Sequence, residues 1–528
     1  MSVAGSGRGR RSVAVVLTAL VLAACSSTAT SDASDPAGPA TDPPQLGAPT
    51  EGFGAVQDAV ELGTFTGTDI WIDPVGGDDA RDGHDRTSAM RTVNAAWERI
   101  PAGATLTSGF RLRLVAGTYP QATSVNYWEN RIGTDAAPII VEAADGPHSA
   151  RFEGDVNMFG VSHFSLIGVD IIREGDTFHC ERCDHILLRD LELDGGTQAH
   201  DNLKVNQSQH VYIESVDVHG ADDNAIDFVA VQDGHVSGSR IHDAVDWCAY
   251  AKGGSAAITF SANEVFNCGT GGITAGQGTG FEFMVAPWLN YETYGVTIVD
   301  NVIHDTQGAG LGVAGGYNAV LAFNTLYAVG SRSHVIEIVH GRRGCDGLTA
   351  ACAAHHDAGG WGSTASEEQM IPNRHVYVYD NVVLNPAGKQ SQWQQFQIDA
   401  PIDPPAGSGV PAPSLADDDL RIAGNVIWNG PPDHPLGTGD GCPDSNTTCN
   451  AAQITADNAI DRVQPVLRDP AHGDYRIGGS ATLPAATPLP DLVWGDTPIA
   501  VPPGATHLSV DVAWDGSARP TNGPAGAG

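Results

Sequence analysis

The feature that most restricts the fold of this chain is a short segment pattern that occurs nine times. Each copy alternates β-branched or other apolar residues with polar ones and ends in a turn residue, as in VTIVDNVIHD (296–305), VYVYDNVVLN (376–385) and LRIAGNVIWN (420–429). This alternation predicts a short β-strand followed by a turn. Strand-length pieces that recur at a regular spacing, with no helix between them, predict a solenoid with one coil per repeat. We therefore expect an all-β fold of the parallel β-helix type.

The position held by Asn301 gives the nine copies a common register. Successive register residues are separated by 22, 25, 23, 24, 38, 23, 57 and 44 residues, so the longer gaps mark inserted loops. Side chains at equal offsets in successive coils should stack about 4.8 Å apart. The asparagines of the register are expected to form a structural ladder without a catalytic role. The register residues are Val169, Leu191, Val216, Ser239, Asn263, Asn301, Asn324, Asn381 and Asn425.

The N-terminus is expected to direct export. Three arginines precede an apolar run that ends in Leu-Ala-Ala-Cys at residues 22–25. A charged start and a short apolar region predict a signal peptide over residues 1–24. The ending resembles a bacterial lipobox, which implies lipid attachment at Cys25; an ordinary signal peptide with an incidental cysteine is the alternative. We expect an extracytoplasmic, monomeric protein anchored by lipid to the membrane of a bacterial cell envelope.

The rest of the chain is expected to contain a tether and one domain. Residues 25–62 are rich in Ser, Thr, Ala, Pro and Asp and predict a flexible tether. Residues 63–528 are expected to form the β-helix, because each coil of a solenoid contacts only its neighbours and one domain can be long. TVNAAWERI (92–100) predicts a short helical cap at the N-terminal end.

Eight cysteines remain after Cys25, and they fall into four pairs of near neighbours along the chain. Export places them in an oxidising compartment, where pairing is expected. The pair 248 and 268 lies at different offsets in adjacent coils, so its pairing is left open. A zinc site at Cys180-x-x-Cys183 is a further alternative. The cysteines are 180, 183, 248, 268, 345, 352, 442 and 449.

The formal net charge of −36 excludes one class of partner and complicates another. Nucleic acid is not expected to bind, since phosphate contacts need a basic surface. An acidic polysaccharide would require a cation that bridges two negative surfaces.

Five aspartates and a lysine are expected to share one patch of the solenoid wall, because they occupy the second half of three consecutive coils. Clustered carboxylates repel one another unless a cation neutralises them. Ca²⁺ accepts six to eight oxygen ligands in flexible geometry, so we predict a Ca²⁺ site here. The alternative is that the aspartates hydrogen-bond their own turns. The residues are Asp201, Asp222, Asp223, Asp227, Asp246 and Lys252.

Lys252 is predicted to be the catalytic base. It is one of three lysines in the chain, against 24 arginines. A lysine amine can lose its proton and act as a general base, which a guanidinium cannot do. The alternative is a surface salt bridge to Asp227 or Asp246. Lys204 also lies thirteen residues past its register residue, so it is expected in the same column as Lys252 and could exchange roles with it.

Two insertions are expected to flank this patch and bind substrate. Residues 276–295 carry Trp288 and Tyr291, whose flat faces suit sugar rings, although the loop could pack on the solenoid for stability alone. Residues 331–347 carry Arg332, His334 and Arg342. Arginine forks suit carboxylates, so this loop is predicted to hold uronate groups, with ordinary ion pairing to Glu337 and Asp346 as the alternative.

Several stretches resemble known families. IWIDPVGGDDARDGHDRTSAMRTVNAAWERIP followed by RLRLVAGTYP resembles the opening of many secreted right-handed β-helix proteins, and the coils from about 160 to 430 resemble the β-helix polysaccharide lyases. Asp201 and GADDNAIDF (220–228) look like the calcium site of the calcium-dependent pectate lyases, and Lys252 in AKGGS looks like their base. The resemblance implies a right-handed β-helix that binds Ca²⁺ and an acidic polysaccharide. Related alginate and chondroitin lyases place an Arg one coil beyond the Lys, where this chain has GGITAGQG (271–278).

Three functions are compatible with these residues. The first is a lyase that cleaves an acidic polysaccharide by calcium-assisted β-elimination, with Lys252 as the base. The second is a hydrolase or epimerase that uses two carboxyl groups, Asp223 with Asp246 or Asp227. The third is a glycan-binding or scaffold protein without catalysis, because a fold does not imply a function.

Overall fold

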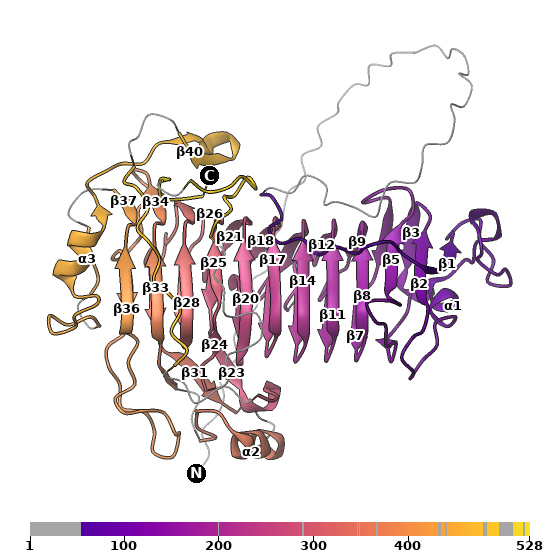
Figure 1. Ribbon diagram of the computed structural model, residues 1–528, viewed down its shortest axis with the longest axis horizontal. Coiled ribbons are helices and arrows are strands. Elements are labelled where there is room, and N and C mark those ends of the chain that lie inside the picture. Colours follow the sequence, from indigo (N-terminus) through magenta and orange to yellow (C-terminus); the bar gives the residue numbers. More distant parts are fainter. Residues whose placement is uncertain are drawn as a thin grey trace, which may run out of the picture. The chain divides into compact units, whose positions relative to one another are not determined.

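Three long parallel sheets form the walls of a solenoid (Figure 1). In this computed structural model the described residues run from 54 to 527, with gaps at 199, 288–289, 346, 348, 366–367, 431–433, 439–440, 479–482, 496–509 and 521–522. Sheet A has 13 strands, sheet B has 12 and sheet C has 10, and the chain returns to each sheet once per coil. The chain is therefore a parallel β-helix.

The strands of sheet A lie side by side in Figure 1. They are β1 (Gly67–Ile72), β2 (Gly109–Leu114), β5 (Ile139–Ala143), β8 (Ser162–Ile167), β11 (Asp184–Arg189), β14 (Gln209–Glu214), β17 (Gln232–Ser237), β20 (Ser255–Ser261), β24 (Thr293–Tyr294), β25 (Thr297–Val299), β28 (Gly316–Ala322), β33 (Arg374–Tyr379) and β36 (Asp418–Ala423).

Sheet B contains β3 (Gly117–Pro120), β6 (Ala150–Glu153), β9 (Val169–Ile172), β12 (Glu192–Asp194), β15 (Asp217–Ala221), β18 (Arg240–Ala244), β21 (Glu264–Cys268), β26 (Val302–His304), β29 (Thr325–Tyr327), β34 (Val382–Asn385), β37 (Val426–Asn429) and β38 (Ala459–Ile460). Sheet C contains β4 (Trp128–Glu129), β7 (Val156–Phe159), β10 (Phe178–Glu181), β13 (Leu203–Asn206), β16 (Ile226–Val229), β19 (Trp247–Lys252), β22 (Gly271–Ala275), β27 (Ala309–Ala314), β30 (Ile336–Val339) and β35 (Phe396–Ile398).

The remaining elements lie at the ends of the solenoid or in its insertions. A small sheet joins β23 (Gly278–Gly280), β31 (Gly341–Gly344) and β32 (Gln369–Ile371), and β39 (Leu467–Asp469) pairs with β40 (Asp474–Ile477). The helices are α1 (Val93–Trp97), α2 (Thr349–Ala358) and α3 (Ala451–Asp457), and the 3₁₀ turns are η1 (Arg86–Ser88), η2 (Gln121–Thr123), η3 (Phe281–Phe283) and η4 (Pro470–His472). The helix predicted over 92–100 is thus the five-residue α1, which Thr92 caps through its side chain and which buries Val93, Ala96 and Trp97.

The predicted register is confirmed along its whole length by the pairings of sheet B. Leu193 pairs with Val218, Val302 with Thr325 and Val382 with Val426, which are the steps expected from the repeats. The asparagine ladder is confirmed as well: the Asn324 backbone N–H and side-chain amide both donate to Asn381 Oδ1, at 3.0 and 2.9 Å. Asn458 extends the ladder by one further coil.

The interior of each coil is filled by apolar residues that face inward from the strands, and these residues stack in rows from one coil to the next. One row of sheet A runs through Leu188, Ile213, Val236 and Phe260, all fully buried. Burying such a side chain contributes about 1.5–3 kcal/mol, so the stacked rows supply most of the stability. All four near-neighbour cysteine pairs form disulfides, including Cys248–Cys268.

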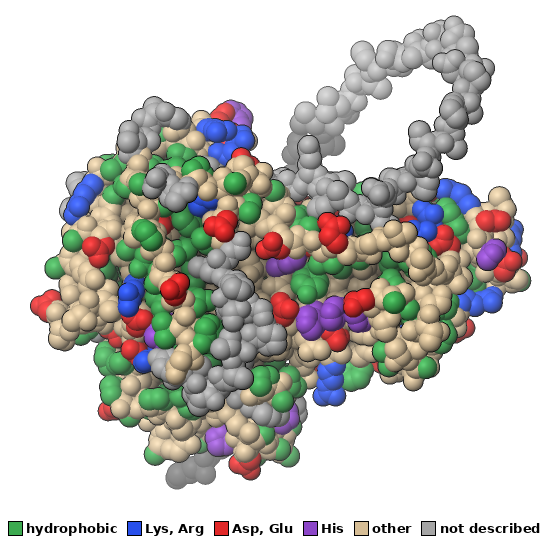
Figure 2. Space-filling model, viewed as in Figure 1, with side chains coloured by type: hydrophobic (Ala, Val, Ile, Leu, Met, Phe, Trp, Pro, Cys, Tyr) green, Lys and Arg blue, Asp and Glu red, His purple; other side chains and the backbone are tan. Residues whose placement is uncertain are grey.

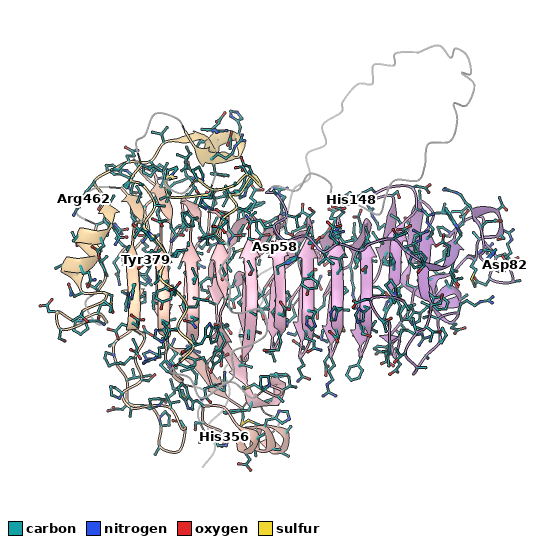
Figure 3. All side chains as sticks on the ribbon, in the orientation of Figure 1. Asp58, Asp82, His148, His356, Tyr379 and Arg462 are labelled. Carbon is teal, nitrogen blue, oxygen red and sulfur yellow. A yellow bond between two sulfur atoms is a disulfide. The ribbon has the colours of Figure 1, made fainter. Side chains whose placement is uncertain are left out.

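The N-terminal end of the described chain and the C-terminal segment around Val493 both lie across sheet A. The described end of the predicted tether contacts it directly: the Gln57 N–H donates to Ser237 Oγ and the Val60 N–H to Glu214 Oε1. Asp58, on this segment, lies over the middle of the sheet in Figure 3. The Ala55 N–H donates to the carbonyl of Trp514, so the N-terminal and C-terminal segments meet there.

Candidate functional site

A cleft of about 640 Å³ lies over sheet C. Its floor includes side chains from β13, β16, β19, β22 and β30, and its walls include residues of β23, η3 and β31. Both insertions that the sequence predicted to flank the site therefore contribute to it.

The floor follows one row of the parallel register. Lys204 pairs with Asp227, Asp227 with Tyr250, and Tyr250 with Thr274. The first three residues are 23 positions apart, so consecutive coils place them side by side. A cation, a carboxyl group and a phenol therefore stack at the centre of the cleft.

Lys204 is held between two buried carboxylates. Its Nζ lies 2.5 Å from Asp201 Oδ2 and 3.0 Å from Asp227 Oδ2. Burial opposes its charge, but Asp227 and Asp201 outweigh that effect and raise the pKa of Lys204. Burial would raise the pKa of Asp201, yet the charge of Lys204 lowers it overall. Lys204 is therefore a fixed cation.

The pKa of Asp227 is shifted in the opposite direction to that of Asp201. Asp227 is 2% exposed, and among the described residues no hydrogen-bond partner reaches its Oδ1 atom. Burial raises the pKa of Asp227, and the negative charge of Asp201 adds to this, against the opposing charges of Lys252 and Lys204. Two neighbouring carboxyl groups that share one lysine are thus biased in opposite directions.

Lys252 has neutral partners in place of carboxylates. Its Nζ donates to Tyr250 Oη at 2.9 Å and to Gln277 Oε1 at 3.3 Å, and it lies 4.4 Å from the centroid of the Tyr250 ring. Tyr250 Oη also accepts from Asn224 Nδ2 at 2.9 Å. Burial, followed by the nearby aspartates, raises the pKa of Tyr250 well above its usual value, so the phenol stays protonated.

The mouth of the cleft is acidic. His200 bridges two aspartates, with Nδ1 2.9 Å from Asp201 Oδ2 and Nε2 3.3 Å from Asp223 Oδ2. Burial raises the pKa of Asp223, and the charges of Asp201 and Asp246 add to the shift. Asp222 is exposed and does not line the cleft.

These contacts decide which of the five aspartates fit a bound Ca²⁺. Asp201 and Asp227 already share the ammonium of Lys204, which supplies the positive charge that the sequence analysis assigned to a metal. Asp201 and Asp223, with His200, form a group at the mouth whose donor atoms lie within 4.8 Å of one another, and their carboxylate oxygens are of the type that Ca²⁺ prefers; Asp246 does not line the cleft. The residues therefore fit a cation at the mouth and not at the centre.

One placement expected from the sequence is wrong. Lys204 and Lys252 do not share a column: Lys204 pairs with Asp227, whereas Lys252 pairs with Val229. The coil of Lys204 has two more residues between its register residue and its sheet C strand than the following coils have, so equal offsets do not mean equal positions.

The predicted substrate-binding residues are spread out. Arg342 is exposed and lines the cleft. Tyr291 packs in a buried cluster with Tyr294, Tyr317 and Trp361, which is the stability alternative considered for its loop. Trp288 and Cys25 lie outside the described residues.

In the second insertion, residues 331–347, some of the side chains also line the cleft and others do not. His334 is buried against Trp393, with ring centroids 5.0 Å apart, and Arg332 is exposed; neither lines the cleft. His340 and Glu337, which were not among the predicted substrate-binding residues, do line it. A second hollow shares His340, Arg342 and Gln369 with the cleft and continues towards Asp399.

Sequence reasoning also missed Tyr250 and Asn224. The 23-residue spacing of Lys204, Asp227 and Tyr250 was a signal that could have identified the phenol. Asn224 donates to both Asp201 and Tyr250, and its position in the DDNAID stretch gave no sign of this role.

Comparison with known proteins supports the architecture. A family model described as a right-handed β-helix region matches residues 176–346. This chain is a right-handed parallel β-helix. No curated protein sequence matches the β-helix significantly.

Several solved structures are similar to this β-helix at low sequence identity. A rhamnogalacturonan lyase is 12% identical, with 68% of this chain and 87% of that chain covered at a TM-score of 0.43. A pectate lyase is 13% identical, with 82% and 95% covered at 0.36, and a mannuronan C-5 epimerase module from Azotobacter vinelandii is 11% identical, with 62% and 91% covered at 0.36.

Proposed function

We propose that this β-helix cleaves an acidic polysaccharide by β-elimination in the cleft of sheet C, with Lys252 as the base. The observation that carries the proposal is the environment of the two cleft lysines. Lys204 is ion-paired with two buried carboxylates, whereas Lys252, which lines the cleft, has Tyr250 and Gln277 as its hydrogen-bond partners among the described residues. Of the two, Lys252 is the amine that can approach a substrate without breaking an ion pair.

The reaction removes the proton on C5 of a uronate residue, next to its carboxylate. In its unprotonated form, the amine of Lys252 would take this proton, the C5–H electron pair would form a C4=C5 double bond, and the C4–O4 bond would break. The departing O4 takes up a proton from solvent, and the new chain end is unsaturated. Tyr250 and Gln277 orient the amine, and general base catalysis of this kind contributes about 10²–10⁴-fold in rate.

Two features of the cleft would bind the negatively charged carboxylates of the substrate. Arg342 lines it and offers a guanidinium fork that suits a carboxylate. Asp201 and Asp223 would hold Ca²⁺ at the mouth, and a bound ion would supply positive charge that attracts the uronate carboxylate and acidifies the neighbouring C–H bond. We therefore expect chelation to weaken binding of acidic polysaccharides.

The test follows the ultraviolet absorbance of the unsaturated product. Polygalacturonate, alginate and glycosaminoglycans are incubated with the protein, with calcium or with chelator. One substrate should give absorbance that falls by about 10²–10⁴-fold in Lys252→Arg, which keeps the charge but cannot act as a base. Lys389→Arg is the matched control, because Lys389 is exposed and pairs with Asp305 outside the cleft.

A second candidate, hydrolysis, is favoured by the opposed pKa shifts of neighbouring carboxyl groups. Asp223 has a raised pKa and Asp201 a lowered one, a pattern typical of an acid and a base that work together. New reducing ends without ultraviolet absorbance, lost in Asp223→Asn and kept in Lys252→Arg, would support hydrolysis. If no substrate gives either ultraviolet absorbance or new reducing ends, both enzymatic proposals are wrong, and a binding or scaffold protein remains.

A further inference from the structure

Three stacked histidines lie on sheet A, a different wall of the β-helix from the cleft. His163 is on β8, His185 on β11 and His210 on β14. Their ring centroids are 4.3 and 4.1 Å apart, with interplanar angles of 12° and 26°. Figure 2 shows histidine side chains gathered on this face beside acidic ones.

The backbone limits which residues fit here, but it does not require histidine. All three have positive φ, at 50°, 55° and 55°, and occupy an unpaired position within each strand. This left-handed region favours Gly, Asn, Asp and His. Later coils place Asn318 and Asp419 at the same position, with φ of 54° and 50°. The three imidazoles therefore call for an explanation beyond backbone conformation.

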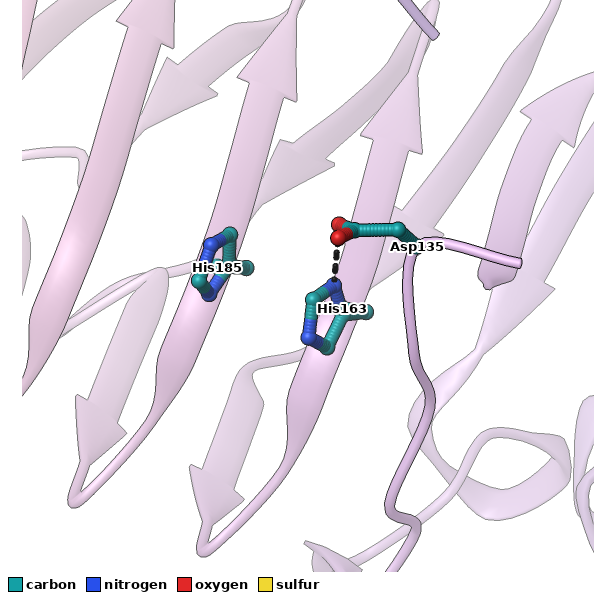
Figure 4. Close-up of side chains that lie close together, drawn as sticks. All are labelled: Asp135, His163 and His185. Atoms are coloured by element: carbon teal, nitrogen blue, oxygen red, sulfur yellow. Dashed lines mark ion pairs between the residues drawn. The ribbon is translucent and has the colours of Figure 1, made fainter. Parts of the chain in front are cut away.

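Carboxylates contact the Nδ1 atoms of the imidazoles. Asp184 Oδ1 is 2.7 Å from His185 Nδ1 and 2.8 Å from His210 Nδ1. Asp135 Oδ1 is 3.2 Å from His163 Nδ1, as Figure 4 shows. In each of the sets Asp184–His185–His210 and Asp135–His163–His185, one donor atom per residue lies within 4.8 Å of the others.

The set Asp184–His185–His210 is better arranged to bind a single ion than the set that contains Asp135. Both of its Nδ1 atoms converge on a single carboxylate oxygen, and its side chains are only 29–37% exposed. In the other set the Asp135 side chain is 92% exposed, so its carboxylate is held less firmly.

We infer that Asp184, His185 and His210 form a binding site for a divalent transition-metal ion such as Zn²⁺. Zinc takes imidazole nitrogen at about 2.0–2.1 Å and carboxylate oxygen at about 2.0–2.2 Å, and three protein ligands leave a fourth position for water. Donors within 4.8 Å of one another can reach such an ion by small rotations of partly exposed side chains. Two nitrogen donors favour zinc-type ions over Ca²⁺ and Mg²⁺, which prefer oxygen.

The test measures Zn²⁺ binding to the full chain by equilibrium dialysis and calorimetry, with Co²⁺ absorption as a report on coordination. His185→Asn and His210→Asn are the variants, because this chain itself uses Asn at the same backbone position. His163→Asn is the matched control, with the same conformation and stacking but outside the proposed ligand set. We expect one equivalent of Zn²⁺, with affinity reduced by roughly a hundredfold in both variants and unchanged in the control.

Each other result overturns the proposal. No saturable Zn²⁺ binding would exclude the site, and equal affinity in all variants would place the ion elsewhere. Loss of binding in His163→Asn but not in His210→Asn would assign the ion to the Asp135 set. Displacement of Zn²⁺ by equimolar Ca²⁺ would argue against nitrogen ligands. Melting temperatures of the variants separate lost ligands from lost folding.

Discussion

At the scale of single residues, the two cleft lysines illustrate how surroundings decide the role of a side chain. Lys204 and Lys252 lie two coils apart on the same sheet, yet the first neutralises two buried carboxylates and the second contacts a phenol and an amide. A buried ion pair whose cation is removed leaves charges that are costly to keep out of water. Lys204 is therefore expected to matter for stability and Lys252 for chemistry.

Lys204→Met should lower the free energy of unfolding by about 3 kcal/mol near neutral pH, because Asp201 and Asp227 lose their shared cation. Urea denaturation measures the change. Adding Asp227→Asn should restore part of the loss by removing one of the facing charges. Lys389→Met is the control, since an exposed pair contributes about 1 kcal/mol or less. A Lys204→Met protein as stable as wild type would contradict this account of the cleft floor.

At the scale of elements, the asparagine ladder links the coils through side chains as well as backbone. Asn324 donates to Asn381 Oδ1 and to the carbonyls of Ile298 and Ala322, and its own Oδ1 accepts from Asn301. All of these groups are buried. A change at one position therefore leaves unsatisfied polar groups in the coils on both sides.

Asn324→Asp is the sharpest test of the ladder, because it keeps the size of the side chain and removes its donors. We expect a loss of roughly 3 kcal/mol or more in the free energy of unfolding at neutral pH, since each buried unsatisfied group costs about 1–3 kcal/mol. Denaturant unfolding followed by circular dichroism measures it. An unchanged denaturation midpoint would mean that the amide stacking contributes little.

The ladder also shows which parts of the fold can be predicted from sequence. The register could be predicted because each coil passes once through the same turn, where a buried amide satisfies backbone groups, and the pattern is local. The column of Lys204 could not be assigned, because two extra residues in one turn shift every later offset in that coil. The packing of Tyr291 against Trp361 depends on two insertions that meet in space, which no local pattern encodes.

At the scale of the whole β-helix, the C-terminal segment is coupled to a buried carboxyl group. Asp380 is fully buried and both of its oxygens accept from the backbone N–H of Thr487, at 2.9 and 3.1 Å. Burial raises the pKa of Asp380 to about 6, although the Thr487 hydrogen bond and Arg519 oppose the shift. Because the pKa of Asp380 in the folded protein lies above the ordinary aspartate value of 3.8, ionisation of Asp380 works against the folded state.

The protonated carboxyl group of Asp380 stabilises the folded protein. This contribution is complete below about pH 3.8 and is lost as the pH rises through about 6. Asp380→Asn removes the titration while keeping an oxygen acceptor for Thr487. It should stabilise the protein at pH 8 by about 2 kcal/mol and change little at pH 4. Thermal unfolding across pH 4–8 measures the difference. An advantage of the variant that grows towards low pH would reverse the assigned sign.

The contact between the N-terminal segment and Trp514 of the C-terminal segment also has a mechanical consequence. A force applied at Gly54 would not peel a terminal coil away, because residues 54–60 contact coils in the middle of the solenoid, at Ser237 and Glu214. Their hydrogen bonds, together with the one between Ala55 and Trp514, would have to break before the force could reach any coil of the β-helix. The strands beneath would keep the cleft of sheet C in register while a pull on the N-terminal side was dissipated in this surface segment.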